Sequence, residues 1–338
     1  MPVHDENVSF QDVVQETDAG KREELISALV SRMTLEEKLF QVGGSAKLSE
    51  LVNYGSAPFP AGGCDRLGIP PVKFSDGPRG VMLDHSTCFP VSMARGATWD
   101  PELEERIGSA IGIEARSQGA NLSGSVCINL LRHPAWGRAQ ETYGEDPQHL
   151  GEMGAAQVRG LQEHIMACLK HFAVNSIENA RFWVDVRIDD RTLHEVYLPH
   201  FKKCIDQGAA CVMGAYNRMN GPHCCHSPEL LTGILREQWG FDGFVISDWS
   251  FALRGSDAIS AGLDIEMPNA IFFGFPLKRK IRNGTIPEET LDRAVRNIVR
   301  QSARFARVGE NNLYTKDLVA CGEHTKLARE AARKSMVL

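Results

Sequence analysis

Several polar residues that could take part in chemistry stand directly after short apolar runs of the chain. They are two aspartates, an arginine, a lysine, a histidine and a tyrosine, with a tryptophan beside one aspartate: Asp76, Arg132, Lys170, His171, Tyr216, Asp248 and Trp249. Charged and hydrogen-bonding groups around a carboxylate suit a polyhydroxylated substrate, because sugar hydroxyls need donors and acceptors from several directions. An aromatic side chain adds a flat face for the sugar ring. Hydrolysis of a glycoside would further need a nucleophilic carboxylate and a separate acid.

Asp248 stands out among these positions because it follows the apolar run from Phe244 to Ile246 by only two residues. Such a run predicts a strand buried on both faces. A buried carboxylate is costly unless it is paired. At the carboxyl end of a parallel strand, however, it points into the crevice where α/β proteins bind ligands. The structural alternative is that Asp248 caps the next helix, but polar residues recur after strand after strand, which favours an active site.

Short apolar strands alternate with amphipathic helices along the chain, and this pattern predicts a parallel sheet. We expect strands at residues 72–75, 126–131, 165–169, 210–215 and 243–247, with a further short one at 262–267. Helices are expected at the capping-box pattern of Thr34, at Asp100-Pro101, over residues 148–162 and 190–207, and after Ser227 and Thr285. A length of 338 residues suits one (β/α)8 barrel of the TIM type, with its active site at the C-terminal ends of the strands.

Composition excludes several classes of function. Hydrophobic residues make up 43% and charged residues 24% of the chain, as in soluble globular enzymes. The net charge is −6 and no basic run occurs, which argues against nucleic acid and membranes as partners. The nine cysteines form no Cys-x-x-Cys pattern, so we expect mostly buried, reduced thiols and no metal site. No phosphate-cradling Gly-rich loop occurs, so we expect no cofactor.

The polar, acidic start of the chain resembles neither a secretory signal nor a transit peptide. We therefore expect a cytoplasmic protein, although a secreted enzyme without its leader would look the same. Residues 1–22 are expected to form a loose N-terminal arm, and residues 23–320 to form the barrel.

Several motifs in order resemble the first, barrel domain of glycoside hydrolase family 3, the β-glucosidase type. The matching stretches are Lys73 to Pro78 (KFSDGP), Arg132 to Pro147 (RHPAWGRAQETYGEDP), Lys170 to Phe172 (KHF), Ala215 to Gly221 (AYNRMNG), Trp239 to Trp249 (WGFDGFVISDW) and Ala261 to Pro268 (AGLDIEMP). The resemblance covers nearly the whole chain, from about residue 23. It implies a retaining, exo-acting β-glycosidase that hydrolyses terminal β-D-glucosyl residues of a β-glucoside or oligosaccharide, without a cofactor or metal.

Site residues are carried over from the resemblance by position. Asp248 matches the catalytic nucleophile, which would form a covalent glycosyl-enzyme. The residues that match the grip on the sugar hydroxyls are Asp76, Arg132, Lys170 and His171. Tyr216 and Trp249 match the aromatic residues beside the nucleophile. Three other charged residues of the motifs are expected to hold the loop by ion pairs: Arg138, Glu141 and Glu145.

One part of the family's pattern has no match in this chain. Residues 321–338 resemble the start of a linker toward a second, α/β sandwich domain, which supplies the general acid/base in family members and is absent here. Glu178 and Asp185 are the alternative acids within the chain. Two other functions stay open: a non-catalytic sugar-binding barrel, and a Schiff-base lyase that uses Lys170 as its nucleophile.

Overall fold

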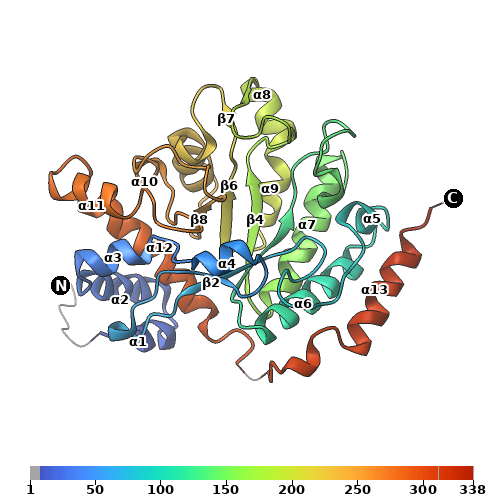
Figure 1. Ribbon diagram of the computed structural model, residues 1–338, viewed down its shortest axis with the longest axis horizontal. Helices are drawn as coiled ribbons and strands as arrows, with labels where there is room; N and C mark the ends of the chain where they lie inside the picture. The colour runs from blue at the N-terminus through green and yellow to red at the C-terminus, as the bar shows by residue number, and fades with distance from the viewer. Residues whose placement is uncertain (1–7, 311, 338) are drawn as a thin grey trace.

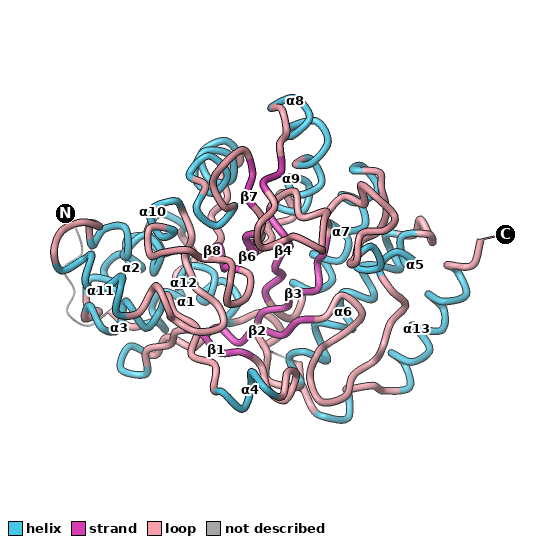
Figure 2. Tube along the Cα trace, turned by 45° about the horizontal axis from the view of Figure 1, so that its top comes forward, coloured by secondary structure: helices cyan, strands magenta, loops and turns pink. Residues whose placement is uncertain are grey.

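The computed structural model describes residues 8–310 and 312–337. Strands occupy the centre of the molecule and helices surround them (Figures 1 and 2). The main sheet has six strands in the order β1-β2-β3-β4-β6-β8. Their bounds are Phe59–Ala61 (β1), Val72–Asp76 (β2), Leu122–Cys127 (β3), Met166–Phe172 (β4), Cys211–Gly214 (β6) and Phe244–Ser247 (β8). A separate ribbon pairs β5 (Asp185–Val186) with β7 (Arg218–Met219).

Two short segments close the six-stranded sheet into a barrel. Residue Ile265 bridges to Ile246 of β8, and its neighbour Glu266 bridges to Gly43. Gly44 then bridges to Ala61 of β1 and completes the circle. Strand β1 runs antiparallel to β2, whereas β2, β3, β4, β6 and β8 pair in parallel. The predicted (β/α)8-type barrel is thus confirmed, with one reversed strand and two segments reduced to single bridges.

Helices cover the outside of this barrel (Figure 1). The α-helices are α1 (Phe10–Gln15), α2 (Ala19–Ser31), α3 (Leu35–Gln41), α4 (Leu48–Val52), α5 (Ser92–Gly96), α6 (Pro101–Ser117), α7 (Pro147–Gln162), α8 (Asp190–Thr192), α9 (Pro199–Ile205), α10 (Ala258–Ala261), α11 (Phe275–Arg282), α12 (Glu288–Ala306) and α13 (Gly322–Lys334). Two π-helical segments add Leu193–Tyr197 and Glu229–Gln238. The predicted starts are confirmed at Thr34, which forms a capping box, and at Asp100, whose side chain caps α6.

Strand β3 begins and ends earlier than its sequence pattern predicts. The sequence analysis placed it at residues 126–131, whereas the structure places it at Leu122–Cys127. Its first half, Leu122 to Ser125, is rich in small residues that are weak strand formers. The small residues are needed because the interior is crowded: a Cβ on Gly124 would lie 2.5 Å from the Phe74 ring. The residues after Cys127 therefore belong to a loop and not to a strand.

The N-terminal segment packs on the barrel. Val8, Phe10 and Val13 are buried in the hydrophobic core, and helices α1 and α2 lie against α12. The described part of the expected loose arm, residues 8–22, is therefore mostly helix, because its apolar side chains have a core to join. Residues 1–7 lie outside the described part. Helix α13 lies on the other side of the molecule, against α5 and α6 (Figure 1).

The core contains one fully buried ion pair that fixes a loop near the site. Arg95 is fully buried, and its Nε lies 3.0 Å from Oε2 of Glu104. Its Nη1 donates to the carbonyl of Pro78 at 2.8 Å, in the turn that follows β2. Breaking such a pair typically costs about 3–5 kcal/mol, because a charge is then left buried without a partner. No helix in the described ranges is long and apolar enough to cross a membrane.

Candidate active site

Asp248 follows directly after β8 and is 7% exposed. Its Oδ1 accepts a hydrogen bond from the Trp249 amide at 2.7 Å, whereas Oδ2 has no hydrogen-bond partner among the described residues. Burial raises the pKa of Asp248, and the nearby positive charges of Arg138 and Lys170 oppose that shift. One carboxylate oxygen is therefore fixed by the backbone, and the other keeps its lone pairs unengaged.

Asp76 and Lys170 form an ion pair across the rim, between two strands that are separated by β3. Asp76 ends β2, Lys170 lies near the end of β4, and Oδ1 of Asp76 contacts Nζ of Lys170. Burial alone would raise the pKa of Asp76, but the charge and hydrogen bond of Lys170 hold it below its usual value. In the same way, the charge of Asp76 outweighs burial and raises the pKa of Lys170. Lys170 is therefore a protonated donor and not a free amine, which argues against the Schiff-base alternative.

The turn after Asp76 requires glycine. The amide of Gly77 donates to Oδ1 of Asp76 at 2.9 Å, and Gly77 has φ +132°. A Cβ at this position would lie 1.6 Å from the carbonyl oxygen of Gly80. The Asp-Gly-Pro sequence thus places the carboxylate at the rim while the backbone folds tightly beneath it.

His171 is held as a neutral ring in one orientation. Its Nδ1 lies 3.0 Å from Oδ1 of Asn129, which also accepts from the His171 amide at 2.9 Å. On the other side, Nη1 of Arg138 lies 3.0 Å from Nε2. Burial, followed by the charges of Arg138 and Lys170, lowers the pKa of His171 well below its usual value. Because Oδ1 of Asn129 can only accept, the proton sits on Nδ1, and Nε2 accepts from Arg138.

This tautomer has a consequence for the nucleophile. Nε2 of His171 lies 3.5 Å from Oδ2 of Asp248, but without a proton it cannot donate to that oxygen. The contact is therefore not an ion pair. Oδ2 of Asp248 stays free to form a bond to another atom.

Arg138, and not the predicted Arg132, is the arginine that the structure places against His171. Arg132 is exposed and forms no hydrogen bond or ion pair with any other described residue. Arg138 has a side chain only 14% exposed, contacts His171, and donates to both oxygens of Glu141 at 3.0 and 2.7 Å. Because β3 ends at Cys127 and not near residue 131, Arg132 stands well beyond the strand end, and the loop returns to the site at Arg138. The expected ion pair of Arg138 does exist, but it serves the site as well as the loop.

The two aromatic residues lie where the sequence analysis expected them, beside Asp248. Tyr216 is 4% exposed, and burial followed by the charge of Asp248 raises its pKa. Trp249 packs against Phe74, with ring centroids 5.0 Å apart, and against the edge of Phe59 at 5.2 Å. The indole is thus fixed by the core on one side.

Sequence reasoning missed two residues of the site, Tyr54 and Asn129. The Tyr54 hydroxyl donates to Oδ2 of Asp76 at 3.2 Å, and its ring lies 5.0 Å from that of Phe59. Tyr54 stands in a Gly-rich loop without any periodic pattern, and Asn129 follows a strand whose end was misplaced. Asn129 is the polar residue that follows the true end of β3 at Cys127. It could have been predicted only if that strand end had been placed correctly.

The alternative acids within the chain are both engaged in ion pairs. Glu178 lies 2.9 Å from Nη1 of Arg181. Asp185 lies 2.9 Å from Nη2 of Arg187 and accepts from the Gly221 amide at 2.9 Å. Each carboxylate is thus paired with an arginine nearby in the chain, while Oε2 of Glu178 has no hydrogen-bond partner among the described residues. Within the described residues, no group of three or more His, Cys, Asp or Glu side chains is arranged to hold a metal ion.

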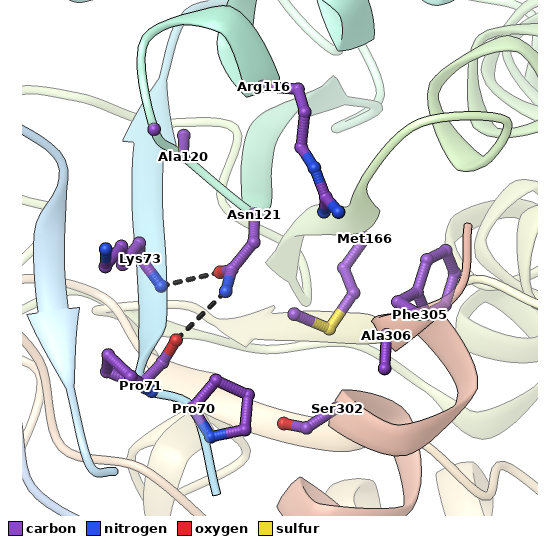
Figure 3. Close-up of a pocket in the computed structure, with 11 residues that line it drawn as sticks. Pro70, Pro71, Lys73, Arg116, Ala120, Asn121, Met166, Ser302, Phe305 and Ala306 are labelled. Atoms are coloured by element: carbon purple, nitrogen blue, oxygen red, sulfur yellow. Dashed lines mark hydrogen bonds between the residues drawn. The ribbon is translucent and has the colours of Figure 1, made fainter. Parts of the chain in front are cut away.

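A cavity of about 350 Å³ lies at the opposite end of the barrel, where the strands begin (Figure 3). Asn121 ties its walls together by accepting from the Lys73 amide at 2.6 Å and donating to the Pro71 carbonyl at 2.9 Å. Arg116 points into the cavity, and Phe305 lies at its edge (Figure 3). The polar cluster described above is at the other rim, where α/β barrels bind their ligands.

The fold and the cluster together define an α/β-barrel protein with a carboxylate-centred site at the carboxyl ends of its strands. The chain belongs to glycosyl hydrolase family 3, since the model of the "Glycosyl hydrolase family 3 N terminal domain" matches residues 10–301. It is 37% identical to a "Beta-glucosidase" of Rhizobium radiobacter, over 81% of this chain and 34% of that protein. It is 35% identical to "Thermostable beta-glucosidase B" of Acetivibrio thermocellus, over 93% of this chain and 42% of that protein.

Solved structures agree with this assignment. Beta-glucosidase 3B from Thermotoga neapolitana in complex with glucose superposes with a TM-score of 0.82 at 32% identity. The match covers 92% of this chain and 46% of that structure. The chain thus spans less than half the length of these relatives.

Proposed function

We propose that the protein is a retaining, exo-acting β-glycosidase of the β-glucosidase type, with Asp248 as its nucleophile. The observation that carries this proposal is the state of Asp248: Oδ1 is fixed by a backbone amide, while Oδ2 has no hydrogen-bond partner among the described residues and lies 3.5 Å from Nε2 of His171. Attack of Oδ2 on the anomeric carbon forms an ester bond and breaks the bond to the leaving oxygen. Water then cleaves the ester with retention of configuration.

The other rim residues grip the sugar in this proposal. Asp76 accepts hydrogen bonds from hydroxyls, and Lys170 and Arg138 donate them. Such charge-assisted bonds are worth about 1.5–3 kcal/mol each. The neutral His171 ring, whose two nitrogens are engaged by Asn129 and Arg138, lines the site without a free hydrogen-bonding group.

The general acid is proposed to come from outside residues 8–337. Glu178 and Asp185 each pair with an arginine nearby in the chain, and neither matches the acid/base that the family resemblance implies. We propose that a second α/β sandwich domain or chain completes the site, as the family resemblance implies. Loss of general acid/base help typically slows a reaction by about 10²–10⁴.

The proposal is tested with dinitrophenyl β-glucoside, whose leaving group needs little protonation. Mass spectrometry of the protein should show a glucosyl adduct on Asp248, and azide should release it as a glycosyl azide of retained configuration. Asp248→Ala should give no adduct, whereas Asp257→Ala, which removes an exposed carboxylate paired with Lys280, should label normally. An adduct that survives Asp248→Ala would refute the nucleophile. Binding of glucose without any adduct would favour a sugar-binding barrel instead.

A further inference from the structure

The cavity at the end of the barrel where the strands begin is built from distant parts of the chain. Pro70 and Pro71 precede β2, Met166 begins β4, and α12 contributes Ser302 and Phe305 (Figure 3). Its volume of about 350 Å³ lies within the range of about 300–1,000 Å³ that small-molecule sites occupy. No residue of the polar cluster at the other rim lines it, so a ligand here would bind apart from the sugar.

A positive charge without a counter-ion stands over this cavity. Arg116, in the last turn of α6, points its guanidinium into the cavity (Figure 3). The guanidinium carbon lies 5.6 Å from the centroid of the Tyr314 ring, within the range of a cation–π contact. No hydrogen bond or ion pair joins Arg116 to any other residue in the described ranges. Because a partly buried charge is costly without a partner, an anion in the cavity would be favoured.

The ring beneath Arg116 is itself fixed. The Tyr314 hydroxyl lies 2.9 Å from Nδ1 of His164 and accepts from Nδ2 of Asn312 at 3.3 Å. The Tyr314 and His164 rings also meet edge to face, with centroids 5.8 Å apart. Gly309 makes room for this arrangement, since a Cβ there would lie 1.8 Å from the Tyr314 hydroxyl oxygen. The guanidinium is thus supported from one side, while its N–H groups are available to a ligand.

The rest of the cavity is mostly apolar, with one further polar group at its far end. The apolar side chains that line it are those of Pro70, Pro71, Met166, Phe305 and Ala306. The Ser302 hydroxyl points from α12 toward Pro70 (Figure 3) and forms no hydrogen bond with another described residue, although Ser302 is only 6% exposed. A phosphate would turn most of its oxygens toward apolar walls. A carboxylate presents two oxygens in one plane, which the fork of a single guanidinium matches.

We propose that this cavity binds a small organic carboxylate with a flat apolar body. Arg116 holds the carboxylate, the proline, methionine and phenylalanine side chains contact the body, and the Ser302 hydroxyl bonds a polar group at the far end of the ligand. The site is independent of the proposed reaction at Asp248, because it lies at the opposite end of the barrel.

The test measures binding of 3-(4-hydroxyphenyl)propionate to the full chain by calorimetry. Arg116→Gln should weaken binding about 10- to 150-fold, the range for hydrogen bonds to a charged group. The uncharged 3-(4-hydroxyphenyl)propionamide should bind wild type weakly and should not distinguish it from Arg116→Gln. Ser302→Ala should weaken the hydroxyphenyl compound about threefold to tenfold and leave 3-phenylpropionate unchanged. The matched control is Arg106→Gln, on the same helix and paired with Glu330, which should bind as wild type does.

A second variant locates the ligand without removing a charge. Ala306→Trp, at the end of α12, fills the cavity and should abolish binding, whereas Asp248→Ala should bind as wild type does. The proposal is overturned if wild type binds no carboxylate, if the amide binds as tightly as the acid, or if Ala306→Trp still binds. Inorganic phosphate that binds more tightly than the carboxylate and is lost in Arg116→Gln would overturn the organic ligand in favour of a simple oxoanion. Loss of binding in Asp248→Ala would place the ligand at the other rim and overturn the assignment.

Discussion

Arg138 and Arg132 belong to one motif, and replacing each of them with glutamine distinguishes their roles in the reaction. Arg138→Gln removes the contact of Nη1 with Nε2 of His171 at 3.0 Å and the double hydrogen bond to Glu141. Arg132→Gln removes nothing comparable, because Arg132 is exposed and contacts no partner among the described residues. A hydrogen bond to a charged group is worth about 1.5–3 kcal/mol. The rate of glycosyl-enzyme formation at low substrate should therefore fall about 10- to 150-fold for Arg138→Gln.

The assay follows the adduct from dinitrophenyl β-glucoside by mass spectrometry, and NMR titration of His171 supplies a second readout. Burial is the largest cause of the low His171 pKa, and the charge of Arg138 is the next. Arg138→Gln should therefore raise the His171 pKa while leaving it below its ordinary value. A purely structural role for Arg138 would not move that pKa. The reasoning is refuted if Arg132→Gln slows the reaction as much, or if the His171 pKa stays unchanged in Arg138→Gln.

Two further predictions follow from other contacts. Tyr54→Phe removes the exposed hydrogen bond to Oδ2 of Asp76 at 3.2 Å. It should lower the same rate about threefold to tenfold, because a hydrogen bond of this kind contributes about 0.5–1.5 kcal/mol; an unchanged rate would exclude a positioning role. Hydrogen bonds to Arg66 lower the pKa of Glu37 from 4.5 to about 2, so its contribution to stability is present above pH 4.5 and is lost as the pH falls toward 2. The deficit of Glu37→Gln in urea unfolding should therefore be largest at neutral pH and shrink on acidification, and a deficit independent of pH would contradict this assignment.

Local patterns in the sequence were enough for the barrel and for most of the rim. The apolar runs of β2, β4, β6 and β8 are short and sharply bounded, and in a parallel barrel their carboxyl ends must share one edge. Asp76, Lys170, His171, Tyr216 and Asp248 follow from that rule alone. Capping at Thr34 and Asp100 is equally local, because each side chain bonds to backbone within three residues. These features need no knowledge of distant contacts.

Other features depend on contacts between distant parts of the chain. Strand β3 could not be placed because Gly124 lies in a strand only to make room for Phe74, which is far away in sequence. Because the strand was expected to end at residue 131, Arg132 was predicted as the arginine of the site, whereas Arg138 contacts His171. The direction of a loop side chain depends on what the loop packs against, and the sequence alone does not show this. The segments that close the barrel are too short to show any strand pattern. The helices before residue 23 are stable because α12 covers them.

The sequence by itself determined which groups stand at the strand ends, and therefore the kind of chemistry that the rim can support. Only the tertiary structure decided the protonation and freedom of those groups. Asn129 sets the tautomer of His171, and Arg138 occupies Nε2, so that Oδ2 of Asp248 is left unbonded. The physical reason is that a hydrogen-bond network depends on distances and directions between residues far apart in the chain, and no local pattern encodes them.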